Sequence, residues 1–408
     1  MTLQKERNYM RFKKLGILVF SAMVICSLAV PAFAGPVWTF GPEDQGKLKL
    51  DYKGQFQLTT RDTGAEADGS GTTTEFNFRR NRIALMGAYG ESFGIYVQTE
   101  FNEDNNIGPL TVTDGDNSNF HILDAVFRFR LNDSLNLWVG KFKYNLTREN
   151  LEACEMPLTL DRSLLIRAPL ASNGTRDKGV AVWGNFFDKK FQYRIDAMNG
   201  RNDSVSAPES NLRYSARVHL SLLDPESEYG YKGTYLGKKK VFTVGAAYQM
   251  ESKVAYADVA NATDSVDYKA WTVDLFTEYP LEGAGTVTFS TAYVKYDLDD
   301  AYQGADPDPL TIGLNGEKNG YYVKAGYMLP SLPLQFFFRY EDWSIADLFG
   351  VFDQKVKWYG GGFNYYLRGQ NLKLTVELSQ TNFDKEGVFS GVTTKDFTTA
   401  TAQLQVIF

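Results

Sequence analysis

The feature that most constrains the fold of this chain is an alternation of apolar and polar residues, repeated in short stretches from residue 47 to the end. In LRYSARVHL (212–220), the first residue and every second one after it are apolar, and those between are polar. KLKLDYKGQFQL (47–58), FQYRIDA (191–197) and LKLTVEL (372–378) follow the same rule. Because successive side chains of a strand point to opposite faces, each stretch predicts a strand with one apolar and one wet face.

The length of the stretches and the connections between them favour a closed barrel in a membrane. A tilted strand needs about ten residues to cross a bilayer, which is the length seen here. Short turns such as 90–92, 132–134 and 330–333 alternate with long polar loops such as 60–74 and 102–119. We therefore predict an all-β fold, a transmembrane antiparallel β-barrel of about 16 strands. The expected strands begin near residues 47, 75, 93, 120, 135, 177, 190, 211, 240, 267, 285, 319, 333, 354, 370 and 394.

Residues 1–34 have the pattern of a cleaved signal peptide. A basic start precedes the apolar run LGILVFSAMVICSLAV, and Ala32 and Ala34 are the small residues expected before a cleavage site. After cleavage, residues 35–46 would form a short periplasmic segment and residues 47–408 the barrel. An exported barrel of this kind is expected in the bacterial outer membrane, in contact with outer-membrane lipid. The alternative is a large secreted β-sandwich, but a series of this length exceeds a sandwich domain of about 100 residues several times over.

Few residues suited to catalysis or metal binding remain after cleavage. Cys154 is then the only cysteine, and the chain has two histidines, His121 and His219. An outer-membrane hydrolase would need a base, and a structural role is the simpler interpretation of both histidines. The acidic stretches 114–119 and 297–308 lack the full EF-hand spacing for calcium. We expect no enzyme activity, cofactor, metal site or nucleic-acid partner.

Basic residues gather on the wet face of strands in the first half of the chain. They outnumber the acids there by five, whereas the wet faces of the second half are close to neutral. FRRNR (78–82) breaks the alternation, as a β-bulge would, so its three arginines are not counted among these basic residues. A basic arc in a low-dielectric wall concentrates anions. The predicted channel-lining residues are Lys47, Lys49, Lys53, Arg128, Arg130, Arg194, Arg213 and Arg217.

The longest connection, 142–176, is unusually apolar for an exposed loop, with a short helix expected at TRENLEA (147–153). We predict that it packs against the inner wall and constricts the channel. Alternatively, its charges pair with one another and only hold the loop folded. The candidate constriction residues are Arg148, Arg162, Arg167 and Arg176.

Three stretches resemble one family, the phosphate-selective porins of the O/P type. TRDKGVAVWGNF (175–186) is similar to the R-D-x-G-V-x-x-x-G segment of that family, and FRRNRIALMG (78–87) to its Arg-rich second strand. YGYKGTYLGKKKVFTVGAAYQ (229–249) is similar to its mid-chain connection and the strand that follows. Phe408 matches the terminal aromatic by which outer-membrane proteins resemble one another. The resemblance implies a trimeric channel of sixteen strands whose third external loop folds into the lumen.

These observations predict passive diffusion of small hydrophilic solutes, biased toward anions such as phosphate or other oxyanions, through a homotrimeric porin. The alternative uses the same barrel as a sheath around a partner such as a multihaem cytochrome. A sheath would need a lumen free of an inward loop, which the apolar connection 142–176 disfavours.

Overall fold

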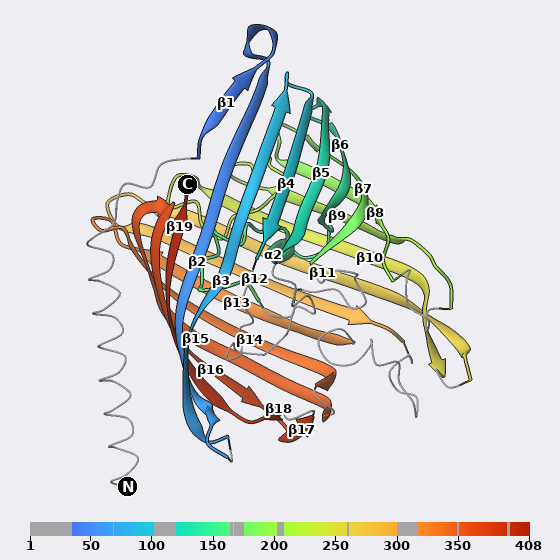
Figure 1. Ribbon diagram of the computed structural model, residues 1–408, viewed down its shortest axis with the longest axis vertical. Helices are drawn as coiled ribbons and strands as arrows, with labels where there is room; N and C mark the ends of the chain where they lie inside the picture. Colours follow the sequence, from blue (N-terminus) through green and yellow to red (C-terminus); the bar gives the residue numbers. More distant parts are fainter. Residues whose placement is uncertain are drawn as a thin grey trace.

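The computed structural model describes residues 35–67, 69–101, 120–163, 166, 175–201, 208–258, 261–299, 317–348, 351–389 and 392–408. The predicted signal peptide lies outside these residues. Sixteen strands of the described part form a closed antiparallel barrel (Figure 1). They are β2 (Gly46–Ala65), β3 (Gly71–Tyr89), β4 (Phe93–Glu100), β5 (His121–Asn132), β6 (Leu135–Lys143), β7 (Arg176–Phe186), β8 (Phe191–Met198), β9 (Arg213–Ser221), β10 (Val241–Asp258), β11 (Thr263–Leu281), β12 (Gly285–Asp297), β13 (Lys318–Met328), β14 (Leu334–Leu348), β15 (Val351–Gln370), β16 (Leu372–Phe383) and β19 (Phe397–Ile407).

The prediction of a sixteen-stranded barrel is confirmed, and no strand begins more than four residues from its expected position. The ring closes where β19 pairs with β2 in antiparallel register. Gln405 and Gln403 of β19 meet Gln55 and Gln57 of β2, with side-chain hydrogen bonds of 2.6 and 2.8 Å. The ring leaves no free sheet edge, and an unpaired edge would expose backbone donors and acceptors.

Polar residues face the inside of this barrel and apolar residues face outward. Along β9, every residue from Arg213 to Ser221 alternates between buried and exposed. The buried members are the polar ones, such as Arg217 at 1% exposure, whereas Tyr214 is 51% exposed. This inversion of the usual soluble arrangement is what a barrel with lipid outside and polar groups inside requires.

Five short elements lie outside the barrel strands. β1 (Val37–Phe40) pairs with the start of β2, and the 3₁₀ helix η1 (Pro42–Asp44) joins the two, so the predicted N-terminal segment carries a strand of its own. β17 (Gly387–Phe389) and β18 (Val392–Thr394) form a hairpin. The expected short helix is α2 (Arg148–Leu151), whose N-cap Thr147 side chain accepts a 3.0 Å hydrogen bond from Asn150 N. No helix in the described ranges is long and apolar enough to span a membrane.

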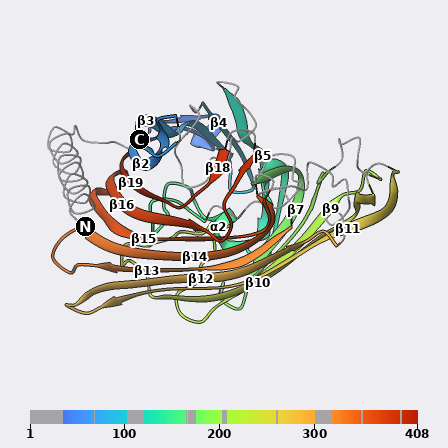
Figure 2. The same cartoon turned by 90° about the horizontal axis from the view of Figure 1, so that it is seen from below.

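Connections alternate between the two ends of the barrel. The connections 90–92, 133–134, 187–190 and 222–240 lie at one end, here called the turn end, and 144–175 lies at the other, the loop end. The main buried apolar cluster includes Tyr144 and Leu151 from the loop end and Tyr229 and Tyr231 from the turn end. Figure 2 shows the strands as a ring around α2. The core of this barrel therefore lies between its wall and two connections that come from opposite ends.

Candidate functional site

The bulge expected in FRRNR exists and sets the geometry of a basic site on the wall. Gln55 pairs with Arg80 whereas Phe56 pairs with Phe78, so Arg79 is the extra residue of β3. The shift lets two successive arginines reach one carboxylate. Arg79 Nε lies 2.7 Å from Asp161 Oδ2, and Arg80 Nη2 lies 2.7 Å from Asp161 Oδ1.

Further basic side chains surround these two arginines. Lys53 binds Glu155 at 2.6 Å, and Lys373 Nζ lies 3.5 Å from the Glu155 backbone oxygen. Lys143 Nζ donates to the Glu152 backbone oxygen at 2.7 Å and lies 3.7 Å from the Cys154 sulfur. We call the following six residues the basic cluster: Lys53, Arg79, Arg80, Lys143, Arg162 and Lys373.

The basic cluster holds more basic than acidic side chains. Its six basic residues engage the side chains of two carboxylic acids, Glu155 and Asp161, and the sulfur of Cys154. Arg162 donates instead to the backbone oxygens of Glu149 and Asn150, at 3.1 and 3.2 Å. Arg79 is the most open of the paired cations, with 32% of its side chain exposed against 3% for Arg80. The site therefore carries a positive excess beside an accessible guanidinium.

The ionisation of the acids near the basic cluster reflects this excess. Burial opposes ionisation of Asp161, but Arg79 and Arg80 hold its pKa well below the usual range. Burial also opposes ionisation of Glu155, and Lys53 nonetheless lowers its pKa to about 2. The Cys154 thiol, buried beside Arg162 and Lys143, likewise has a pKa well below its usual value. Opposite charges within a few ångströms outweigh desolvation at all three groups.

Segment 144–163 contacts wall residues of β2, β13, β14 and β16, which belong to one arc of the ring. Glu155 meets Lys53 of β2, whereas Glu149 forms an ion pair with Lys324 of β13. Ser163 Oγ donates to Glu341 of β14 at 2.7 Å, and Leu160 N donates to Glu377 of β16 at 3.2 Å. The connection itself spans 144–175, since β6 ends at Lys143 and β7 begins at Arg176. It is therefore two residues shorter at its start, and one at its end, than the predicted 142–176.

A second connection, segment 222–240, meets segment 144–163. Tyr231 N donates to Leu151 O at 3.3 Å, Ala153 N donates to Tyr231 O at 3.0 Å, and Gly233 N donates to Met156 O at 2.9 Å. Arg148 and Glu226 form a doubly hydrogen-bonded ion pair at 2.7 and 2.8 Å. The sequence indicated 229–249 by resemblance only and did not predict that it packs against segment 144–163. The three closely spaced tyrosines Tyr229, Tyr231 and Tyr235 are a signal that could have indicated this packing.

Three of the predicted channel-lining arginines are buried, which corrects the expectation that their side chains face water. Arg213 Nη2 lies 2.6 Å from Glu251, and Arg217 Nη1 lies 2.7 Å from Asp274. The guanidinium carbon of Arg194 lies 4.4 Å from the ring centre of Tyr231. Acids from β10 and β11 therefore neutralise two arginines of the predicted arc, because cross-strand pairing brings together residues that are far apart in the sequence.

The other predicted lining residues occupy different environments. Lys49 binds Asp51 at 2.7 Å, and Lys47 is exposed near the turn end. Arg130 is also exposed there and pairs with Asp133 at 2.6 Å. Arg128 is half-buried against aromatic rings. Of these predicted residues, Lys53 alone belongs to the basic cluster.

The candidate constriction residues also separate. Arg148 and Arg162 are buried in segment 144–163, and Arg162 belongs to the basic cluster. Arg176 is the first residue of β7 and binds Asp124 at 3.1 Å. Arg167 lies outside the described residues. The basic cluster instead includes Arg79 and Arg80, which the bulge had removed from the predicted set.

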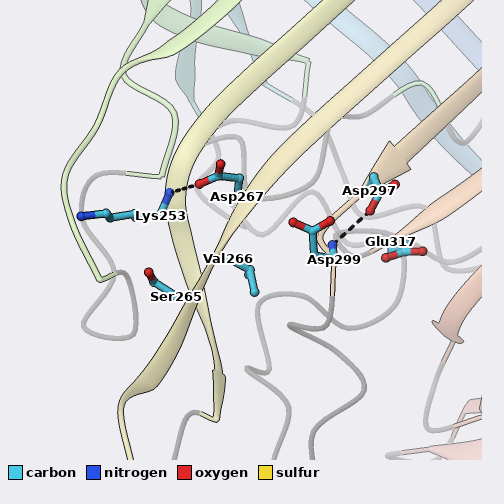
Figure 3. Close-up of a pocket in the computed structure, with 7 residues that line it drawn as sticks. All are labelled: Lys253, Ser265, Val266, Asp267, Asp297, Asp299 and Glu317. Atoms are coloured by element: carbon cyan, nitrogen blue, oxygen red, sulfur yellow. Dashed lines mark hydrogen bonds between the residues drawn. The ribbon is translucent and has the colours of Figure 1, made fainter.

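No arrangement suited to catalysis or metal binding is present in the parts of the chain that the structure describes. His219 Nδ1 lies 2.7 Å from the Tyr231 hydroxyl, and His121 lies 3.9 Å from Glu100. Within those same ranges, no group of three acids, histidines or cysteines could hold a metal ion. Figure 3 shows a pocket at the loop end of β10, β11 and β12, where Asp267 accepts from Lys253 N and Asp297 from Asp299 N. Two of its acids thus accept hydrogen bonds from backbone groups, and Asp299 pairs with Lys269.

Solved structures with the same fold include an anion-selective porin and an outer membrane protein. The anion-selective porin from Comamonas acidovorans has a TM-score of 0.57 at 12% identity, with 89% of this chain and 100% of that one covered. Salmonella typhi OmpF in complex with daunomycin has a TM-score of 0.56 at 13% identity, covering 90% and 99%. The trimer form of Vibrio cholerae OmpT has a TM-score of 0.50 at 12% identity, covering 88% and 99%. At these identities the likeness concerns the fold.

No curated protein matches the chain. The model of the family described as phosphate-selective porin O and P matches residues 50–408, nearly the whole of the barrel. Porins of this fold are channels of the bacterial outer membrane and not enzymes, so the predicted location and the expected absence of enzyme activity agree with the match. The chain therefore belongs to the phosphate-selective porin O and P family.

Proposed function

We propose that this porin is a diffusion channel biased toward small hydrophilic anions, such as phosphate or other oxyanions. The observation that carries this proposal is the basic cluster, whose six basic side chains engage the side chains of only two carboxylates in the described residues. Fixed positive charge inside a low-dielectric wall raises the local concentration of anions. Arg79 suits an oxyanion, because its planar guanidinium can donate two parallel hydrogen bonds. The anion-selective porin named above supports the same direction of selectivity.

Segment 144–163 forms the constriction in this proposal. Its contacts with β2, β13, β14 and β16, and with Arg217 of β9 across the ring, support a position within the channel. Its meeting with segment 222–240 fills the space beside β8, β9 and β11 with packed side chains. Solutes then pass on the side of the basic cluster, along β2 and β3.

The alternative of a sheath around a cytochrome is not supported by the comparisons. A sheath needs an open lumen, and the two packed connections oppose it. A homotrimer is the assembly that we propose, on the ground that a solved neighbour of the same fold is described as a trimer.

The test of this proposal is the reversal potential of the purified protein in planar bilayers under a KCl gradient. Arg79→Gln combined with Arg80→Gln should shift the potential toward cation preference, and more strongly at low salt. The Debye length is about 30 Å at 0.01 M and about 3 Å at 1 M, so screening hides fixed charge at high salt. Lys253→Gln is the control, since Lys253 is exposed at the loop end and pairs with Glu209.

Two outcomes would contradict the proposal. An unchanged reversal potential in the double variant, with the barrel intact, would remove the basic cluster as the source of selectivity. A wild-type protein that forms no open channel would overturn diffusion itself and revive the sheath.

A further inference from the structure

We propose a second anion site at the turn end of the lumen, in which Arg128 and the aromatic rings around it bind a small aromatic carboxylate. The site rests on the proposed function, because it serves solutes that pass through the same channel. The Arg128 guanidinium carbon lies 4.7 Å from the ring centre of Tyr96 and 4.5 Å from that of Trp138. Such contacts hold the planar group in place through cation–π attraction while its edge keeps its hydrogen-bond donors.

Arg128 differs from three other arginines of the inner wall, Arg176, Arg213 and Arg217, in its lack of a close acid. Arg176, Arg213 and Arg217 each bind a carboxylate within about 3 Å. Among the residues that the structure describes, no carboxylate forms an ion pair with Arg128, and its buried Nε has no hydrogen-bond partner. Two carboxylates act on it at longer range, those of Asp124 and Glu228. The guanidinium group of Arg128 therefore has N–H donors left for an incoming anion.

Asp124 does not compete for Arg128, because Arg176 holds it at 3.1 Å. Glu228 is exposed in segment 222–240 and forms no ion pair in the described residues. Arg194 also lacks a bound carboxylate, but it is 1% exposed and donates to Gln192 at 2.6 Å. Arg128 is thus both partly accessible and without a counter-charge in contact.

The surroundings of Arg128 are aromatic on one side and small on the other. Trp138 is its partner on β6, and the Tyr229 ring stacks on Trp138 with centroids 3.8 Å apart. On β4 its partner is Gly94, whose own neighbour on β3 is Ala88. A Cβ on Gly94 would lie 3.9 Å from that of Arg128, so this glycine borders the arginine directly. The position opposite Arg128 on β4 therefore has no side chain, and Tyr96, two residues further along β4, supplies a ring beside the guanidinium.

This combination favours a carboxylate attached to an aromatic ring over an inorganic oxyanion. The guanidinium edge would bind the carboxylate in a two-bond arrangement. The ring would pack in offset or edge-to-face contact with Tyr96 or Trp138, as aromatic pairs prefer. Phosphate would use the charge alone and would gain nothing from the rings.

Arg128 lies far from Arg79, the most open of the paired cations in the basic cluster. Ala88, in the same inner row as Arg128, is nine residues further along β3 than Arg79. Nine residues of strand correspond to about 30 Å. A solute therefore meets the two positive sites one after the other, and each can be removed alone.

The test measures block of single-channel current by benzoate, with acetate and inorganic phosphate as comparison anions. Benzoate should block the wild type at lower concentration than acetate does. Arg128→Gln should weaken the benzoate block by about tenfold or more, since a hydrogen-bonded charge is lost. Arg128→Lys keeps the charge but loses the planar fork, and should recover only part of the effect. The control is Arg130→Gln, two residues along β5, where Arg130 is exposed and pairs with Asp133.

The outcomes separate this inference from the proposed function. If Arg128→Gln keeps the wild-type benzoate block while channel and reversal potential are normal, the aromatic site is refuted and the anion channel stands. Equal block by acetate and benzoate in the wild type would also refute it. If Tyr96→Leu, which keeps Arg128, abolishes the preference for benzoate over acetate, the ring contact is supported.

Discussion

Replacing Arg148 with methionine should separate the two connections that meet inside the barrel. Arg148 is 0% exposed and forms both hydrogen bonds to Glu226. Removing one member of a buried ion pair leaves the other charge uncompensated, at a cost of about 3–5 kcal/mol. The three backbone hydrogen bonds between segments 144–163 and 222–240 contribute about 0.5–1.5 kcal/mol each. The free-energy cost of the unpaired Glu226 is therefore comparable with the combined contribution of the three hydrogen bonds. The contact between the two segments should open in a large fraction of molecules.

The expected result is a larger and noisier single-channel conductance in planar bilayers. Replacing both members, Arg148→Met with Glu226→Leu, should restore a conductance near that of the wild type, because neither charge is then buried alone. Arg130→Met is the control, since its pair with Asp133 is exposed and exposed pairs contribute about 0–1 kcal/mol. Retention of the folded, heat-modifiable form on gels would show that the barrel itself remains intact.

The pH dependence gives this prediction a sign. In the wild type, burial opposes ionisation of Glu226, but Arg148 lowers its pKa from 4.5 to about 2. The ionised Glu226 therefore stabilises the contact between segments 144–163 and 222–240 fully above pH 4.5, and this stabilisation is lost as the pH falls toward 2. In Arg148→Met the charge that opposes burial is gone and the Tyr235 hydroxyl still donates to the carboxylate at 2.7 Å, so the pKa of Glu226 rises above its wild-type value. Acidification should then bring the conductance of the variant back toward the wild-type value. Quiet, wild-type currents in Arg148→Met at neutral pH would refute the reasoning.

Two further predictions concern topology and closure of the ring. In a Cys154→Ser background, Ser70→Cys at the loop end should react with an impermeant thiol reagent on intact cells, whereas Ser331→Cys in the short turn 329–333 should not. Both serines are exposed. Labelling of Ser331→Cys alone would reverse the assigned orientation. Phe408→Asp should reduce the amount of heat-modifiable, membrane-inserted protein. Phe408 exchanges backbone hydrogen bonds of 2.6 and 3.0 Å with Tyr52, and its ring centre lies 5.2 Å from that of Tyr52. The control is Ile407→Val, and normal assembly of Phe408→Asp would contradict the prediction.

The strands could be predicted from the sequence because one local rule, alternation, controls them. The start of β9 was expected at 211 and lies at Arg213, and β4 and β12 begin where they were expected. The environment of each wall arginine follows no local rule. Arg217 and its partner Asp274 are 57 residues apart in the chain, so only the register of β9, β10 and β11 brings them together.

The basic cluster was missed for a related reason. One added residue at Arg79 reverses the face on which later residues of a strand point, so a strict count by twos fails at that position. The break in the pattern was visible in FRRNR, but the partner Asp161 lies in an irregular connection whose path the alternation does not describe.

The seam between β19 and β2 also decides when this protein can fold. Gln55 and Gln405 are hydrogen-bonded although 350 residues separate them in the chain. Contacts between such distant residues form slowly, because a long loop must close before they gain any energy. In lipid, each unpaired backbone group of an open sheet edge costs several kcal/mol, so hairpins cannot wait in the bilayer for the strands that follow them. Insertion and ring closure must therefore occur together, after synthesis has passed β19, and the exported chain has to be kept from pairing with its neighbours until then.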